Sequence, residues 1–496
     1  MTEDLRQARA LLEAGKVIEG QAICKAVLRR DPSHRGALML QGIALLRSKE
    51  LPAALAAFES LTALEPNQAN GWLHRGLCLI GLGRFDEAAA CLERSTTLQP
   101  GNVIALYHHG GALTFLGRFT EALPILDRAR ALAPGDPAIQ NIYASTLKWV
   151  GGTDEAMRQY DVLTTTFPDF APGWIGKSLL HLALGDYPEG WKLNEWRLRV
   201  PGRSGWPEIA RLPRWCGQAV PRNSTILLHS DAGLGDAVQF CRLASLVAAG
   251  GARVSLLVPR SLGRIMRSVE GVEQVIVEGD PIPDFDFQCP LMSLPHALGI
   301  TTETVPVNVP YLDPSADLIE MWRRRLKQIH GPRIGLVWSA AARAGEPWAD
   351  AYGRRRSMAL ATLAPLATVP GIEFVSLQFG AGAEQAKHPP PGMTLHDFGD
   401  ALGDFEETAA LIANLDLVIS VDTAAAHLAG AIGKPVWLMS AFDMDWRWIL
   451  GRTDSPWYPR HRLFRQPIST DWASVVDDVT GALRDLASAR GLPRDD

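Results

Sequence analysis

The feature that most constrains this chain is a proline that returns every 34 residues through its first third. The prolines of this register are Pro32, Pro66, Pro100, Pro134 and Pro168. A second position of the same register always holds a small residue: Ala54, Ala88, Ala122 and Ala156. An interval of 34 residues is the length of one helix–turn–helix hairpin, and small residues allow two helices to cross closely. The pattern predicts stacked hairpins over residues 1–199, as five repeats followed by a divergent helical pair over residues 171–199.

The segment from Gly71 to Ala88 resembles the consensus of tetratricopeptide (TPR) repeats, and a further small position recurs in it. That position holds Gly42, Gly76, Gly110 and Ala144. Stacked TPR hairpins share one core and curve into a superhelix, whose concave groove commonly binds peptides. The resemblance therefore implies a polypeptide partner in the groove. O-GlcNAc transferases with TPR repeats carry an asparagine ladder there, but the matching residues here are Leu40, His74, His108 and Ile142. We do not carry over that clamp, and we expect both histidines to be solvated rather than to line the groove.

Composition limits the remaining possibilities. A chain of 496 residues is too long for one core and indicates several domains. The net charge of −5 indicates neither a nucleic acid nor an anionic membrane as partner. The six cysteines form no C-x-x-C pair, which fits a reducing cytoplasm and predicts no zinc site. No stretch approaches the ~18 apolar residues of a membrane span, and the start lacks a signal-peptide pattern. We expect a soluble, cytoplasmic protein.

Beyond the repeats, residues 200–223 lack helical periodicity and predict a connector. Strand-like apolar runs then alternate with helical stretches in two series, which predicts two parallel α/β lobes. We place the first lobe at 224–315, an interlobe helix at 316–332, and the second lobe, which binds the donor, at 333–490. Two Rossmann-like lobes with a ligand cleft between them form the GT-B architecture. The expected fold is thus an all-α TPR superhelix followed by an α/β GT-B fold.

The first predicted strand ends in a glycine-rich turn that contains Gly233 and Gly235 and continues into Asp236. A dinucleotide fingerprint would need a further glycine where Val238 stands, so an NAD enzyme is disfavoured. The turn resembles that of the heptosyltransferases (glycosyltransferase family 9), which implies Asp236 as the general base and Gly233, Gly235 and Gln239 beside the donor. A helix N-terminus favours an ionised carboxylate. The alternative is that Asp236 only caps its helix.

The stronger motif lies in the second lobe, where an apolar strand over 417–421 is followed by Asp422, Thr423, Ala424 and, after two alanines, His427. It resembles the D-[ST]-G-x-x-H donor-binding motif of heptosyltransferase-like enzymes, with Ala424 where that family has glycine. Thr423 and His427 are four residues apart and so share one helix face. A helix N-terminus suits a diphosphate. The alternative is a core histidine in a capped helix.

A long irregular stretch over 339–357 follows the first strand of the second lobe, and such loops tend to be functional. The resemblance implies that Ser339 and an arginine, Arg354 or Arg356, bind the donor phosphates, although a solvated basic turn is equally consistent. Gln378 ends the next strand, at the cleft-edge position where related enzymes contact the nucleotide, so the resemblance implies that it also binds the donor. Asp443-Met444-Asp445 has the D-x-D spelling of metal-dependent glycosyltransferases, but GT-B enzymes generally need no metal. We expect no metal and no cofactor beside the nucleotide sugar.

These features together predict a bacterial-type glycosyltransferase that moves a sugar from a nucleotide-activated donor to a protein Ser or Thr. The acceptor, for which flagellin is one candidate, would lie in the TPR groove. The resemblance implies an inverting, metal-independent reaction. One alternative is transfer to a glycan or a lipid-linked acceptor, which the repeats make less natural. Another is a non-catalytic TPR scaffold.

Overall fold

The computed structural model describes residues 3–200, 206–341, 347–380, 382–443 and 445–490. The chain divides into two compact units. The first is the repeat array up to Leu163 together with residues 347–352, and the second begins at Thr164 and holds the rest. Among the described residues, no helix is both long and apolar enough to cross a membrane.

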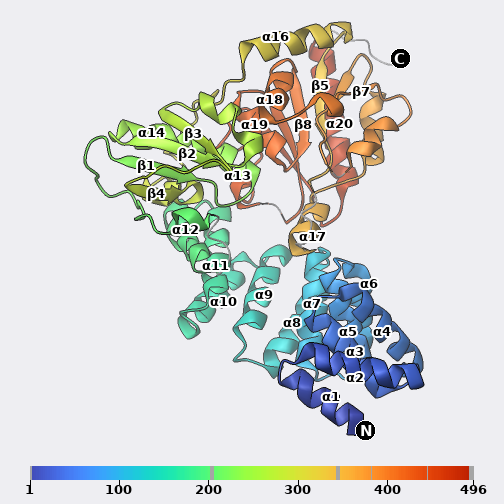
Figure 1. The fold of residues 1–496 in the computed structure, drawn as a ribbon. Coiled ribbons are helices and arrows are strands. Elements are labelled where there is room, and N and C mark those ends of the chain that lie inside the picture. Colours follow the sequence, from blue (N-terminus) through green and yellow to red (C-terminus); the bar gives the residue numbers. More distant parts are fainter. Residues whose placement is uncertain (1–2, 201–205, 342–346, 381, 444, 491–496) are drawn as a thin grey trace. The chain divides into compact units, whose positions relative to one another are not determined.

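The first unit is a series of helical hairpins (Figure 1). Its helices are α1 (Glu3–Glu13), α2 (Val17–Arg30), α3 (Arg35–Arg47), α4 (Leu51–Leu64), α5 (Ala69–Gly81), α6 (Phe85–Leu98), α7 (Val103–Phe115), α8 (Phe119–Leu132), α9 (Pro137–Leu147) and most of α10 (Thr153–Thr166). Each second helix ends two residues before the recurring proline, because proline disfavours a helical residue in front of it. The turn within most hairpins uses a glycine with positive φ, such as Gly83 at 71°, whereas the turn between α3 and α4 uses Lys49 at 60°. These helices follow one another as the hairpins that the 34-residue period predicts.

Small residues hold the two helices of each hairpin together as predicted. The alanines of the 34-residue register are fully buried, for example Ala54 and Ala88. A methyl group added to Gly42 would lie 2.5 Å from Phe58, and one added to Gly110 would lie 2.5 Å from Leu126. Such distances are far inside van der Waals contact, so a larger residue at these positions would force Phe58 or Leu126 to move.

His74 and His108 are half-buried, and not fully solvated as expected. His74 stacks on Phe58 with ring centroids 5.2 Å apart. Burial lowers the pKa of His74 below its ordinary value and lowers the pKa of His108 to about 4. Both side chains are therefore neutral at pH 7 and belong to the packing of the repeats.

The second unit opens with the predicted final helical pair, α11 (Ala171–Ala183) and α12 (Tyr187–Asn194). Trp191 is 1% exposed, and its ring packs edge-on against Trp446 at 4.9 Å and Phe240 at 5.7 Å. The Trp457 indole N–H donates to the Tyr187 hydroxyl at 2.7 Å. The pair thus forms where the sequence predicts it, but its large aromatic side chains bury themselves in the α/β lobes. We therefore describe it with the lobes and not with the repeats.

Two parallel sheets form the rest of this unit (Figure 1). The first has the order β3-β2-β1-β4, and the second has the order β10-β9-β8-β5-β6-β7. The strands are β1 (Thr225–His229), β2 (Arg253–Val258), β3 (Val272–Val277), β4 (Phe287–Pro290), β5 (Arg333–Val337), β6 (Glu373–Ser376), β7 (Leu395–Asp397), β8 (Leu417–Val421), β9 (Val436–Ser440) and β10 (His461–Arg465). The sequence analysis did not predict β7 and β10.

The helices that connect these strands are α13 (Leu234–Phe240), α14 (Ala244–Ala249), α15 (Leu294–Ala297), α16 (Ala316–Arg325), α17 (Pro347–Arg355), α18 (Phe405–Ala413), α19 (Ala424–Ala431) and α20 (Trp472–Ala489). The interlobe helix is shorter than predicted, since α16 ends at Arg325 and a short 3-10 turn follows. The second sheet has the strand order of a Rossmann fold, which reverses between β5 and β8. In such sheets ligands bind beyond the carboxyl ends of the strands at this reversal. Ser339 and Asp422 lie just beyond those two ends.

Candidate functional site

The first half of the site is the turn between β1 and α13. Gly233 is the N-cap of α13, and the Asp236 carboxylate reaches back to accept the Gly233 backbone N–H at 2.7 Å. Asp236 therefore stabilises the start of its helix, as the alternative reading of this residue proposed. Its side chain is still 21% exposed. A carboxylate has about four lone-pair positions, so a capping contact leaves it able to accept further hydrogen bonds.

The second half is the turn between β8 and α19. Thr423 is the N-cap of α19, but its hydroxyl makes no capping hydrogen bond and lies 3.2 Å from the Ser420 hydroxyl. Ala424 is the first residue of the helix. This arrangement leaves the first backbone N–H groups of α19 without a side-chain cap, which is the geometry that binds anions at a helix N-terminus.

Helices α13 and α19 approach each other closely at Gly235 of α13, where the absence of a side chain leaves room for the contact. A methyl group added to Gly235 would be 2.8 Å from Cδ2 of His427 and 3.5 Å from Cα of Ala424. The start of α13 from the first lobe therefore lies directly against the start of α19 from the second. The predicted base and the predicted donor motif, almost 200 residues apart in the sequence, share one site.

His427 is held firmly in this contact. Its Nδ1 lies 2.9 Å from the Tyr458 hydroxyl, and its ring stacks on Trp448 at 5.5 Å. Burial, and then the charge of Arg447, lower the pKa of His427 well below its ordinary value, so the ring is neutral at pH 7. A neutral imidazole has one N–H, which donates from either nitrogen but not from both.

Arg447 joins the two lobes at the same place. It lies in the 3-10 turn Trp446–Trp448 of the second lobe, and its guanidinium forms an ion pair with Asp236 of the first. It also donates from Nε to the Gln239 side-chain oxygen at 2.5 Å and from Nη1 to Asp445 at 2.7 Å. Burial lowers the pKa of Arg447, but the carboxylates of Asp445 and Asp236 more than offset this and raise it. The side chain is a permanent buried cation.

Asp422 is buried at the end of β8 and faces two cationic or polar neighbours. Its carboxylate is 3.9 Å from the Arg356 guanidinium and 3.9 Å from Nε2 of His427. Burial raises the pKa of Asp422, and the charge of Arg356 opposes this. Arg356 thus points toward the donor motif, whereas Arg354 is exposed. The structure brings Arg356, and not Arg354, to the motif.

Gln378 supports the loop that follows β5. Its side-chain oxygen accepts the backbone N–H groups of Trp338 and Ser339 at 3.1 and 2.9 Å, and its nitrogen donates to the Ser339 carbonyl at 2.8 Å. The side chain is 2% exposed. Gln378 therefore orients Ser339 and the strand end, and its buried amide faces the protein backbone. Gln239 is also a buried amide that contacts the protein itself: it is fully buried, and its side-chain oxygen accepts a hydrogen bond from Arg447.

The D-x-D segment has arginine partners. Asp443 forms an ion pair with Arg355, and Asp445 forms one with Arg447. Met444 lies outside the described residues. Within the described parts of the chain, no group of three or more His, Cys, Asp or Glu side chains is placed to hold a metal ion.

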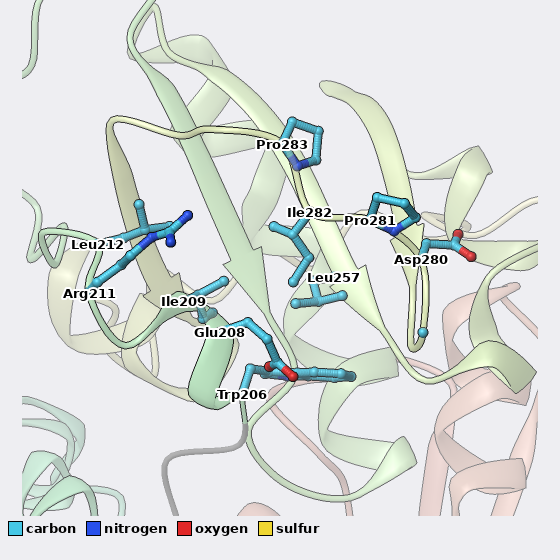
Figure 2. Close-up of a pocket in the computed structure, with 11 residues that line it drawn as sticks. Trp206, Glu208, Ile209, Arg211, Leu212, Leu257, Asp280, Pro281, Ile282 and Pro283 are labelled. Atoms are coloured by element: carbon cyan, nitrogen blue, oxygen red, sulfur yellow. The ribbon is translucent and has the colours of Figure 1, made fainter.

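A separate cavity of about 520 Å³ lies on the first sheet, on the face that carries Leu257 (Figure 2). The Trp206 indole closes one end and donates to the Ser230 carbonyl at 2.7 Å. Pro281, Ile282 and Pro283 line the opposite side. None of the predicted site residues lines this cavity, so we assign it no part in the site.

The sequence analysis assigned no role to Arg447 or Tyr458, and nothing in their spacing relates them to Asp236 or His427. The sequence does place Arg447 between Trp446 and Trp448, and a guanidinium can stack on an indole ring.

Comparisons with known proteins fit both units. Models of the tetratricopeptide repeat match residues 5–69, 40–106 and 79–146. The model of glycosyltransferase family 9 (heptosyltransferase) matches residues 402–437, a segment that includes Asp422 and His427 but not Asp236. Protein FlbA of Caulobacter vibrioides is 29% identical over 346 residues, which are 65% of this chain and 56% of that protein. The chain therefore matches little more than half the length of this relative.

Similar solved structures are TPR proteins. They include the TPR protein YrrB, with a TM-score of 0.32 and 19% identity over 36% of this chain and 93% of YrrB. A TPR protein of Parabacteroides merdae has a TM-score of 0.36 and 18% identity over 40% of this chain and 78% of its own. From the repeat models, the family 9 match and the two parallel sheets, the chain is a tetratricopeptide-repeat protein with a glycosyltransferase-like C-terminal region.

Proposed function

We propose that the second unit transfers a sugar from a nucleotide-activated donor to the hydroxyl of a protein Ser or Thr. The observation that carries this proposal is the contact between the starts of α13 and α19, which brings Asp236 to the donor motif of the other lobe. The reversal of strand order beside Ser339 and Asp422 supports a ligand at that edge of the second sheet.

The donor diphosphate would bind at the N-terminus of α19. The uncapped backbone N–H groups there, with the Thr423 hydroxyl, offer hydrogen-bond donors to an anion. Arg356 adds a positive charge beside Asp422. His427, neutral and buried, would donate at most one hydrogen bond and would otherwise fix the position of the helix. Ser339, oriented by Gln378, would complete the phosphate contacts.

Asp236 would act as the general base. In the proposed step the acceptor hydroxyl gives its proton to Asp236, and its oxygen forms a bond to the anomeric carbon. The bond from that carbon to the phosphate oxygen breaks, and its electron pair leaves on the nucleotide. Direct displacement in this manner inverts the anomeric centre. Proton transfer to a positioned carboxylate typically contributes a factor of 10² to 10⁴ in rate.

The repeats would supply the acceptor. TPR grooves commonly bind polypeptide segments, and a protein acceptor explains why a transferase carries them. Flagellin is one candidate acceptor within this proposal. A non-catalytic scaffold is the second candidate function, and one observation favours it: both oxygens of Asp236 already have partners, Gly233 on one and Arg447 on the other.

The test begins with thermal unfolding of the full chain in the presence of UDP, GDP, dTDP, ADP and CMP and their sugars, since specific binding raises the melting temperature by mass action. The nucleotide sugar that binds is then used to measure transfer. Asp236→Asn should reduce turnover at least 100-fold and leave donor affinity within about two-fold. His427→Ala should weaken both.

Asp284→Asn is the matched control, because Asp284 is fully exposed and lies outside the site. It should behave like the wild type. Wild-type turnover by Asp236→Asn would remove the general-base assignment. A folded protein that responds to no nucleotide would favour the scaffold.

A further inference from the structure

Among the residues that the structure describes, Arg447 is the one that connects Asp236 to the opposite lobe by a charge. It is 6% exposed, and its guanidinium uses all three nitrogens on three acceptors from two lobes. Two of them, Asp236 and Gln239, come from α13, and the third, Asp445, comes from its own turn. Its guanidinium also stacks on Trp446, 4.3 Å from the ring centroid.

The chemistry of this contact requires an arginine. A guanidinium is planar and presents its N–H groups in a fixed fork, so it can hold three acceptors in one plane at set angles. A lysine ammonium is a compact charge on a flexible stem and cannot reproduce that geometry. The charge is buried, and a buried cation keeps its partners because losing one leaves an uncompensated charge. Asp236 is therefore held in one orientation.

That orientation leaves part of the carboxylate available. Arg447 binds Oδ1, and the Gly233 N–H binds Oδ2. Each carboxylate oxygen has two lone-pair positions, so one on each remains for an acceptor hydroxyl. The side chain is accordingly 21% exposed at the site.

We propose that Arg447 is a positioning residue for the general base, which rests on the proposed function. It fixes the Asp236 carboxylate from the lobe that carries the donor motif, so the base is aligned only while the two lobes are in contact. A misplacement of about 1 Å in a reacting group can reduce turnover about 100-fold. Arg447 therefore acts on kcat through Asp236 and does not contact the donor.

The experiment measures kcat and the donor KM of the full chain, with the nucleotide sugar that the thermal screen selects from the UDP, GDP, dTDP, ADP and CMP series. Arg447→Lys should lower kcat between about 10- and 100-fold and leave the donor KM within about two-fold. The double variant Asp236→Asn with Arg447→Lys should be no slower than Asp236→Asn alone, because residues that act as a unit are not additive.

Arg333→Lys is the control for a general loss of packing. Arg333 is a partly buried arginine at the start of β5 in the same lobe, and it donates to the backbone carbonyl of Ile329 at 3.4 Å. It should lose stability but keep kcat. Asp445→Asn removes one carboxylate partner of Arg447 and should lower kcat by a smaller factor than Arg447→Lys does. This second variant replaces Arg447→Lys in the test if Arg447→Lys does not fold.

Wild-type kcat in a folded Arg447→Lys protein would overturn the positioning role while leaving Asp236 as the base. A double variant whose losses multiply would also overturn it, because the two residues would then act independently. A wild-type chain that is folded but transfers no sugar from any of these donors would overturn the proposed function, and the role of Arg447 with it.

Discussion

Replacement of Gly235 by alanine tests whether the two lobes meet as described. The added methyl group would lie 2.8 Å from Cδ2 of His427. The histidine cannot easily move away, since its Nδ1 is hydrogen bonded to Tyr458 and its ring is stacked on Trp448. The substitution must therefore push α13 from α19 or displace the histidine.

The magnitude follows from two opposed effects. Overpacking a well-ordered contact typically costs about 1–3 kcal/mol. Alanine is a better helix former than glycine by up to about 1 kcal/mol, and Gly235 lies within α13 without a positive φ, so this gain applies. We expect a net loss of roughly 1–2 kcal/mol in the free energy of unfolding. The shift of α13 should also disturb Asp236, the next residue.

Gly481→Ala is the matched control, because Gly481 lies inside α20 and a methyl group added there would have nothing within 4 Å. It should stabilise the protein by about 0.5–1 kcal/mol. The assay is urea denaturation of the full chain followed by tryptophan fluorescence, with the midpoints of both variants compared at constant slope. If Gly235→Ala unfolds at or above the wild-type midpoint while Gly481→Ala is stabilised, the close approach of α13 and α19 is wrong.

Two further predictions concern the second unit. A chain that begins at Phe167 should melt cooperatively, whereas a chain that begins at Ser224 should not. The shorter chain lacks Trp191, and loss of a buried tryptophan costs about 3–5 kcal/mol. Equal melting of the two chains would contradict the role of α12. Burial lowers the pKa of His461 to about 3. The unfolded chain binds a proton there near pH 6.5 and the folded chain does not, so stability should fall below that pH by about 1.4 kcal/mol per unit. Urea midpoints between pH 7.5 and 5.5 measure this, and His461→Gln should flatten the slope.

Local patterns allowed much of the fold to be predicted. The period of 34 residues sets the lengths of the helices, and small residues at fixed positions set how they pack, so the repeats could be placed without coordinates. The apolar run of β8 is bounded by turn residues and matches the strand predicted over 417–421 residue for residue. The strand at Leu395–Asp397 is short and half-exposed, so it has no apolar run to identify it.

The boundary between the repeats and the α/β lobes was harder to predict from the sequence. The final helical pair has the periodicity of a repeat, and only the packing of Trp191 against Trp446 and Phe240 shows that it belongs with the lobes. Likewise, burial of His74 and His108 depends on neighbouring hairpins, because a helix face is solvated or covered according to what stacks on it.

The sequence by itself determined the repeats, the two α/β lobes, and the two turns that carry Asp236 and His427, because each of these is encoded by residues close together in the chain. The tertiary structure alone decided that the turns meet, that a glycine permits their contact, and that Arg447 reaches Asp236 from 211 residues away. Pairings of this kind depend on how two sheets are placed against each other. That placement results from side chains spread over the whole core, and no local pattern records it.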